Sequence, residues 1–279
     1  MKDGPICLVT GATSGIGKAA VHAFAAHGAT LLLVCRNKEK GESVLKELQA
    51  MRSDGKYRLY VGDLSSQKDI RRLANEIRTE NPKLDVMVNN AGGVFATRVL
   101  TIDDIELTFA LNHLGYFLLT SLLLDQLRAA PSARIVNVSS QAHQFGRITF
   151  DDLGLEKGYN PMKSYAQSKL ANLLFTYELS RILAGTTVTV NALHPGAVRT
   201  NFGKDLSGIA GFVFRRLDMF MRSPEKGAET LIWLAEAPEL NGVSGKYFFD
   251  KKEIRSSKIS YDREVAKRLW ATSEKMTGI

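Results

Sequence analysis

The chain has 279 residues, of which 44% are apolar and 24% charged, and these values are ordinary for a globular protein. Lysine and arginine exceed aspartate and glutamate by eight, a surplus that favours anionic partners such as a cofactor phosphate but also fits a basic, solvated surface. Because no block of five like charges occurs, the sequence argues against a nucleic-acid-binding tail.

Neither the cysteines nor the apolar runs indicate a secreted or membrane protein. Cys7 and Cys35 lie in short apolar runs typical of buried strands, without the spacing of a disulfide framework or a zinc site. The five histidines lack metal-ligand spacing, so no metal is expected. No signal peptide is visible, and no run reaches the roughly 18 apolar residues that a membrane span needs. We therefore expect a cytoplasmic protein.

Strand-like and helix-like segments alternate along the chain. The expected strands are, in order, Ile6–Thr10, Thr30–Cys35, Arg58–Val61, Leu84–Val88, Arg134–Val138, Thr187–Leu193 and Lys246–Phe249. The helical patterns between the first four are Lys18–His27, Lys38–Met51 and Gln67–Thr79. Continuous leucine and β-branched runs indicate strands buried on both faces, as in a parallel sheet. The alternation predicts one α/β domain over residues 1–279, a Rossmann-type doubly wound parallel sheet of about seven strands with helices on both faces.

A glycine-rich segment joins the first expected strand to the first helix. Its glycines permit a tight turn and close approach of the backbone to a pyrophosphate, and the helix N-terminus offers free N–H groups. The spacing G-x-x-x-G-x-G differs from the common dinucleotide fingerprint, and a purely structural turn is the alternative, but the position after the first strand favours a nucleotide. The residues expected to hold the phosphates are Gly11, Thr13, Ser14, Gly15, Ile16 and Gly17.

The end of the second expected strand predicts which nucleotide binds. In this fold an acidic residue about 20 residues after the loop would hold the ribose 2′-hydroxyl of NAD, but no carboxylate stands there. Arg36 is placed to meet a 2′-phosphate instead, with Lys38 or Lys18 as candidate helpers, although it could also be a solvated strand end. We predict NADP(H) rather than NAD(H).

A tyrosine and a lysine form the candidate catalytic pair. Tyr165 and Lys169 stand four apart in a helix-like segment, and therefore on one helical face. A nearby ammonium lowers the pKa of a phenol from about 10, so that the tyrosine can act as acid or base near neutral pH. The Tyr-x-x-x-Lys pattern alone is common by chance.

Other polar motifs fall at the ends of expected strands. Asn89-Asn90-Ala91-Gly92 ends the fourth strand and is followed by Asn112, Ser139-Ser140 ends the fifth, and the stretch from His194 to Thr200 ends the sixth. In a parallel sheet these strand ends share one edge, where ligands bind. The tyrosine and lysine therefore have companions at a single site.

These motifs, in this order and over nearly the whole chain, resemble the short-chain dehydrogenase/reductase family. The resemblance implies Tyr165 as the general acid/base, Lys169 as the residue that tunes it and contacts the nicotinamide ribose, and Ser140 as the hydroxyl that polarises the substrate carbonyl, with Ser139 structural. It implies that Asn112 holds a water in the proton relay. The further predicted cofactor contacts, most of them implied by the resemblance, are Arg36, Asn37, Asp63, Leu64, Asn90, Ala91, Gly92, Pro195, Gly196, Val198 and Thr200, together with Tyr165 and Lys169.

Several segments resemble the retinol dehydrogenase-like branch more closely. They are Cys35-Arg36-Asn37, the run from Asn112 to Thr120, Ser168-Lys169-Leu170-Ala171-Asn172 and Arg268-Leu269-Trp270. This likeness implies NADP(H) and a lipophilic aldehyde, ketone or alcohol. Membrane-bound members of the branch carry an N-terminal hydrophobic anchor, which this sequence does not show. The family likeness also suggests a homodimer or homotetramer through the helices that follow Asn112 and contain Tyr165.

Residues 200–224 form an apolar, arginine-containing segment that we predict to be a substrate lid. An amphipathic helix packed on the sheet is one alternative, and docking to a membrane surface is another. The substrate-lining residues we expect are His143, Phe202 and Phe212. The sequence thus predicts an NADP(H)-dependent oxidoreductase acting on a lipophilic carbonyl or alcohol. An NAD-linked alcohol dehydrogenase and a non-catalytic nucleotide-binding module are the alternatives.

Overall fold

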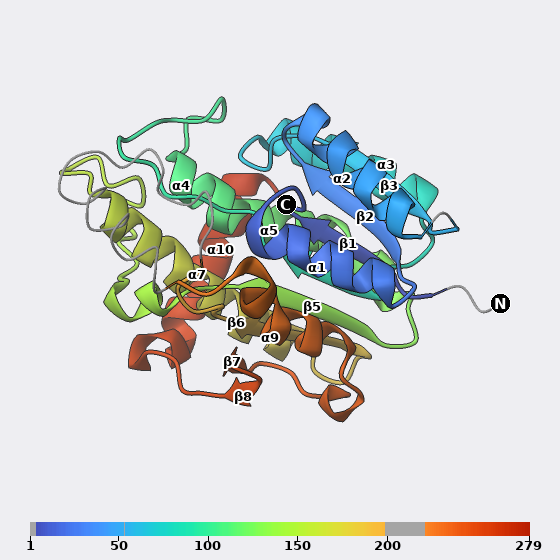
Figure 1. Cartoon of the computed structure of the whole chain (residues 1–279). Coiled ribbons are helices and arrows are strands. Elements are labelled where there is room, and N and C mark those ends of the chain that lie inside the picture. Colours follow the sequence, from blue (N-terminus) through green and yellow to red (C-terminus); the bar gives the residue numbers. More distant parts are fainter. Residues whose placement is uncertain (1–3, 53, 199–220) are drawn as a thin grey trace.

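A mixed sheet runs through the centre of the computed structural model, which describes residues 4–52, 54–198 and 221–279 (Figure 1). Within those residues its eight strands are β1 (Ile6–Thr10), β2 (Thr30–Cys35), β3 (Tyr57–Val61), β4 (Val86–Asn89), β5 (Ala133–Val138), β6 (Val188–Leu193), β7 (Tyr247–Phe249) and β8 (Lys252–Glu253). They lie in the order β3-β2-β1-β4-β5-β6-β7-β8, and only β7 and β8 pair antiparallel. The predicted doubly wound parallel sheet is confirmed.

The strand that the sequence did not predict is β8. Asp250 and Lys251 both have positive φ, at 49° and 59°, which is the backbone of a tight two-residue hairpin turn. The turn folds the two exposed residues of β8 back onto β7. A strand of two charged residues contains no hydrophobic alternation, so a count based on apolar runs stops at seven.

Helices cover both faces of the sheet. The helical elements of the described residues are α1 (Gly15–Ala26), α2 (Lys38–Met51), α3 (Gln67–Glu80), α4 (Leu107–Phe109), η1 (Ala110–Leu114), α5 (Gly115–Leu122), α6 (Leu124–Arg128), η2 (Gln141–Phe145), α7 (Pro161–Ile182), α9 (Pro224–Glu236), η4 (Pro238–Leu240), η5 (Lys258–Tyr261) and α10 (Arg263–Thr277). Of these, η1 is one π-helical turn, whereas η2, η4 and η5 are 3₁₀ turns.

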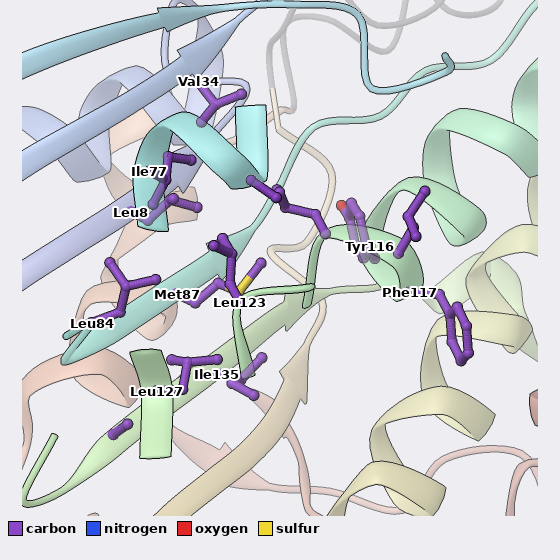
Figure 2. Packing of buried hydrophobic residues seen from close by; sticks show 14 of the residues in the cluster. Leu8, Val34, Ile77, Leu84, Met87, Tyr116, Phe117, Leu123, Leu127 and Ile135 are labelled. Carbon is purple, nitrogen blue, oxygen red and sulfur yellow. The ribbon is translucent and has the colours of Figure 1, made fainter. Parts of the chain in front are cut away.

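Alternate residues of each central strand enter different cores, which is why the strands are apolar throughout. Leu8 of β1 packs under α3, α5 and α7 together with Ile77 and Met87 (Figure 2). Its neighbours Cys7 and Val9 enter the opposite core, which lies under α1, α2 and α9. Burial on both faces requires a strand without polar alternation. The sheet is therefore enclosed, and its carboxyl edge is the side where loops can form a site.

The strand order reverses between β1 and β4. The chain runs outward from β1 to β3, returns to β4 on the other side of β1, and then continues outward through β7. The loops that leave β1 and β4 therefore diverge at their carboxyl ends, and such a point is where open α/β sheets bind ligands. The predicted glycine loop and Asn89-Asn90 leave the sheet there.

Candidate active site

The glycine loop is shaped by close backbone contacts. Gly11 has φ +67°, and a Cβ on Gly17 would lie 2.3 Å from the Gly11 carbonyl oxygen, so both positions require glycine. Asn90 donates from Nδ2 to the Thr10 carbonyl at 2.9 Å, which ties the loop to the end of β4. Ser14 precedes α1 without capping it through its side chain, so the first turn presents its N–H groups to a ligand. The loop therefore fits a pyrophosphate.

A cavity of about 280 Å³ lies beside this loop, between α1 and α2. Its lining residues are Thr13, Ser14, Lys18, Lys40, Ser43, Val44 and Glu47. Lys18 is paired with Glu47 at 2.8 Å, whereas no ion pair is found for Lys40 within the described residues. Hydroxyl groups and a cation suit a phosphate. Sequence reasoning missed Lys40, although its place in the first turn of α2 could have indicated it.

Arg36 and Asn37 lie at the end of β2, close to this cavity. The Arg36 side chain is 71% exposed and its guanidinium lies 3.8 Å from the Asp63 carboxylate. Asn37 caps α2, because its Oδ1 accepts from the Lys40 N–H at 2.8 Å. Arg36 is thus free to turn toward a ligand, while the side-chain oxygen of Asn37 already has a structural role.

The candidate catalytic side chains meet where α7 crosses the end of β5. The Tyr165 hydroxyl hydrogen-bonds with Ser140, and the Lys169 Nζ lies 5.6 Å from the centroid of the Tyr165 ring. Nζ also donates to the Val138 carbonyl at 2.9 Å. Ser139 points elsewhere and donates to the Lys169 carbonyl at 2.8 Å. Of the two serines, only Ser140 faces the tyrosine.

Burial controls the protonation of this pair. Desolvation raises the pKa of Tyr165 to about 12, against the opposing effect of the Ser140 hydrogen bond. Desolvation also lowers the pKa of Lys169 to about 7. At neutral pH the phenol therefore carries its proton, and the lysine can take up or release one.

Asn112 lies in the π-helical turn η1 and is fully buried. Its Oδ1 accepts from the Gly93 N–H at 2.8 Å, and its Nδ2 donates to the Gly93 carbonyl at 3.0 Å and to Ser168 Oγ at 2.9 Å. Both amide N–H donors are therefore used to fix the β4 loop against α7. A π-turn is a common feature of functional sites because it alters the regular pattern of backbone hydrogen bonds. A water held by Asn112 would therefore contact its backbone or the second lone pair of its Oδ1 rather than its amide donors.

Glu106 links the segment that leads into η1, which contains Asn112, to α7, which contains Tyr165 and Lys169. The sequence analysis missed this role. Its buried carboxylate accepts from the N–H groups of Thr108 and Phe109 at 2.8 and 2.9 Å, which caps α4. The same carboxylate accepts from Ser164 Oγ at 2.9 Å, next to Tyr165. Glutamate is not a preferred N-cap residue, so only the tertiary contact shows its role.

The remaining predicted cofactor residues lie around the same sheet edge. Asp63 accepts from the Ser65 hydroxyl and N–H, and Leu64 is buried with its carbonyl against Gly115. Pro195, Gly196 and Val198 follow β6, and Val198 forms a β-bridge with Arg222. Thr200, Phe202 and Phe212 lie outside the described residues, as does most of the predicted lid. The last predicted lid residue, Pro224, begins α9.

The substrate-lining role of His143 stays a prediction, and the structure shows a ring engaged in contacts within the chain. Its ring is fully buried, with Nδ1 2.7 Å from the Ser140 carbonyl and Nε2 accepting from the Ser257 N–H at 3.0 Å. Burial lowers its pKa, so the ring is neutral. With both nitrogens engaged, His143 connects the Ser140 turn to the C-terminal segment.

A family model described as short chain dehydrogenase matches residues 5–208. The chain belongs to the short-chain dehydrogenase family. It is 41% identical to retinol dehydrogenase 14 of Mus musculus, with 100% of this chain and 87% of the relative covered. It is 43% identical to retinol dehydrogenase 13 of Homo sapiens, with 99% and 85% covered. These relatives confirm the retinol dehydrogenase-like branch of the short-chain dehydrogenases.

Solved structures of other proteins show the same fold. An uncharacterized protein from Mycobacterium paratuberculosis is 32% identical, with a TM-score of 0.78 over 98% of this chain and 93% of that one. A short chain dehydrogenase from Escherichia coli CFT073, solved in complex with NADPH, is 25% identical, with a TM-score of 0.70 over 88% and 95%. In the ranges 4–52, 54–198 and 221–279, no helix has both the length and the hydropathy to cross a membrane.

The lowered pKa of Lys169 predicts a pH-dependent stability of the cofactor-free protein. Between about 7 and the unfolded value of 10.5 the unfolded chain binds the extra proton, so the free energy of unfolding rises with pH across this window. Lys169→Met removes that dependence. We expect the variant to be more stable than the wild type below pH 7, with a difference that shrinks toward pH 10 in urea unfolding. The same change at the exposed Lys163 of α7 is the control, and parallel profiles for all three proteins would contradict the prediction.

Removal of the Glu106 carboxylate should loosen both catalytic elements. Glu106→Ala leaves two buried N–H groups and the Ser164 hydroxyl without their acceptor, and we expect a loss of roughly 2–4 kcal/mol in the free energy of unfolding. Denaturant unfolding measures it. Glu156→Ala removes an exposed carboxylate that pairs with Arg98 and should cost under about 0.5 kcal/mol. Equal losses in the two variants would refute the role assigned to Glu106.

Proposed function

We propose that this short-chain dehydrogenase uses NADP(H) to interconvert a lipophilic aldehyde or ketone and its alcohol. The observation that carries the proposal is the contact of Tyr165 with Ser140 beside Lys169, at the edge of the sheet that also bears the glycine loop. A sensor that only bound the nucleotide would not need a buried acid/base pair there. An oxidoreductase therefore accounts for more of the site than a binding module does.

The shape of the cofactor region supports a dinucleotide with a 2′-phosphate. The glycine loop and the first turn of α1 would hold the pyrophosphate, because Gly11 and Gly17 let the loop pack tightly against the end of β4 while the first N–H groups of α1 stay available to a ligand. Lys40 and the exposed Arg36 would pair with the 2′-phosphate. The complex of the Escherichia coli relative with NADPH agrees with this preference.

The chemistry that a bound NADP(H) supplies is hydride transfer to or from the carbonyl carbon. Ser140 would donate a hydrogen bond to the substrate oxygen and so stabilise the negative charge that develops on it. Tyr165, protonated at neutral pH, would give its proton to that oxygen during reduction and take it back during oxidation. Lys169, with a pKa of about 7, would then return a proton to the phenol. The groups near Asn112 would supply Lys169 with a new proton.

Apolar side chains next to the catalytic residues support a lipophilic substrate. Phe145 is 87% exposed at the end of the turn that begins after Ser140, and Met162 is 47% exposed one turn before Tyr165. Phe145 lies in the turn that Ser140 caps and Met162 in the helix that carries Tyr165, so both can contact a substrate bound there. The names of the relatives, retinol dehydrogenases, agree with an apolar alcohol. The segment 200–224 remains our prediction for the lid.

Tyr165→Phe tests the acid/base assignment. The ring keeps its place but loses the transferable proton, so kcat for reduction of retinal or of a long-chain aldehyde should fall by about 10²–10⁴-fold. The Kd for NADPH, measured by fluorescence titration, should stay within about twofold. Full turnover by this variant would disprove the mechanism. A wild-type protein that binds NADPH but reduces none of a graded series of aldehydes and ketones would favour the non-catalytic alternative.

Lys40→Gln and Arg36→Ala test the choice of cofactor. Each removes a cation from the proposed 2′-phosphate site, so the Kd for NADPH should rise by about tenfold or more while that for NADH changes little. Lys46→Gln, at an exposed lysine of the same helix that does not line the cavity, serves as the matched control. Equal losses for NADPH and NADH would favour the NAD-linked alcohol dehydrogenase instead.

A further inference from the structure

The C-terminal helix α10 packs across the outside of α7, so that two layers of helix cover the sheet on this side (Figure 1). Ala266 and Leu269 of α10 are buried among Leu170, Leu174 and Phe109, which belong to α7 and α4. As a result, every residue from Ser164 to Tyr177 is buried within a single chain. A helix that kept one side for another subunit would show an exposed apolar stripe over this length.

Trp270 closes the contact between α10 and the two helices beneath it. Its ring lies edge-on to Phe117 of α5, with centroids 4.9 Å apart, and stacks on Phe175 of α7 at 5.9 Å. Aromatic pairs in these geometries stabilise beyond the area that they bury. The seam that Trp270 forms with His113 and Ser273 has no room for a water molecule. The interface between α10 and the α5/α7 pair is therefore closely packed and dry, like the interior of a domain.

The side of α10 that faces solvent is charged. Its exposed residues are Arg263, Glu264, Lys267, Arg268, Ala271 and Lys275. Interface cores are depleted in charged residues, and long cationic side chains lose entropy when they are immobilised. A second copy of the chain approaching α5 and α7 would thus meet a charged helix in place of an apolar face.

A hydrogen bond joins α10 to the turn that carries Asn112. Ser273 Oγ donates to the Leu269 carbonyl and lies 2.9 Å from Nε2 of His113, the residue after Asn112 in η1. With its own proton given to Leu269, Ser273 accepts from the ring. Burial lowers the pKa of His113 to about 3, so the ring stays neutral and this contact does not titrate near neutral pH.

The last turn of α10 is fastened to α3. Gln67 Nε2 donates to the Met276 carbonyl at 2.9 Å, and the Arg71 guanidinium donates to the Thr277 carbonyl. The helix is therefore fixed at its end as well as along its apolar side. Its position relative to η1 is set by contacts on α3, α5 and α7 together.

We infer that α10 occupies, within one chain, the place on α5 and α7 where a second subunit was expected, and that Ser273 positions Asn112 through His113. The suggested dimer or tetramer through these two helices is then excluded by the chain itself. Ser273 is a positioning residue, since it touches neither substrate nor cofactor. This second part rests on the proposed function, because Asn112 matters to turnover only in an active dehydrogenase.

Sedimentation velocity and amide hydrogen exchange of the full chain test the first part without any assay of activity. We expect a monomer over a wide range of concentration. If a larger species forms, the exchange of α5, α7 and α10 should be the same in dilute and concentrated samples, because the subunits meet elsewhere. Protection of these three helices that increases with association would overturn the inference.

Ser273→Ala tests the second part, with Thr272→Ala as the matched control, since the Thr272 hydroxyl donates to the Arg268 carbonyl within its own helix. For Ser273→Ala we expect faster amide exchange in η1 (Ala110–Leu114) and roughly tenfold lower kcat, with unchanged KM for NADPH and aldehyde. Thr272→Ala should change none of these.

The two readouts separate the possible failures. Unchanged exchange in η1 would refute the positioning role whatever the activity. Faster exchange with unchanged kcat would refute it as well. If the wild-type chain showed no turnover with any carbonyl, the exchange result would still decide whether Ser273 holds the turn, and only the proposed function would fail.

Discussion

Buried amide and hydroxyl side chains join α7 to the centre of the sheet, and the active site depends on this connection. Asn89 of β4 donates to Asn137 of β5 at 2.8 Å and to Thr120 of α5 at 3.0 Å. Asn137 in turn donates to Thr176 of α7 at 2.9 Å. Such bonds have direction, whereas apolar packing alone allows a helix to slide or rotate. They fix the face of α7 that bears the lysine and tyrosine toward the end of β5.

The same burial that fixes the catalytic pair also sets its chemistry. The altered pKa values of Tyr165 and Lys169 are caused by desolvation and, for the tyrosine, are opposed by one hydrogen bond. Desolvation disfavours the charged form of each group, so it leaves a protonated phenol beside a lysine that titrates near neutrality. A positive charge brought by a ligand would favour the phenolate. Tyr165 therefore stays protonated and uncharged at neutral pH as long as no such ligand is bound.

The sequence predicted the fold, and it placed the candidate site residues at one edge of the sheet, because both depend on local patterns. Apolar runs mark strands that are buried on both faces, and the ends of parallel strands meet at one edge, so the glycine loop, Ser140 and Asn112 could be placed together without coordinates. The β8 strand was not predicted, because it forms where a tight turn pairs two residues with β7 and has no hydrophobic pattern of its own. The contacts of the His143 ring could not be predicted, because sequence distance from Ser140 does not tell which way a 3₁₀ turn directs a side chain.

What the sequence could not show are contacts between distant elements. The Glu106 carboxylate accepts from Ser164 and thereby couples the turn of Asn112 to the helix of Tyr165. In the sequence, however, Glu106 looks like any acidic residue that precedes a helix. The apolar side of α10 predicts burial but not the partner, because the same stripe could meet another subunit or its own chain. The rings of Phe117, Phe175 and Trp270 decide this in favour of the chain itself. Because α10 packs over α7, the helix that bears Tyr165 and Lys169 is enclosed by another helix of the same chain.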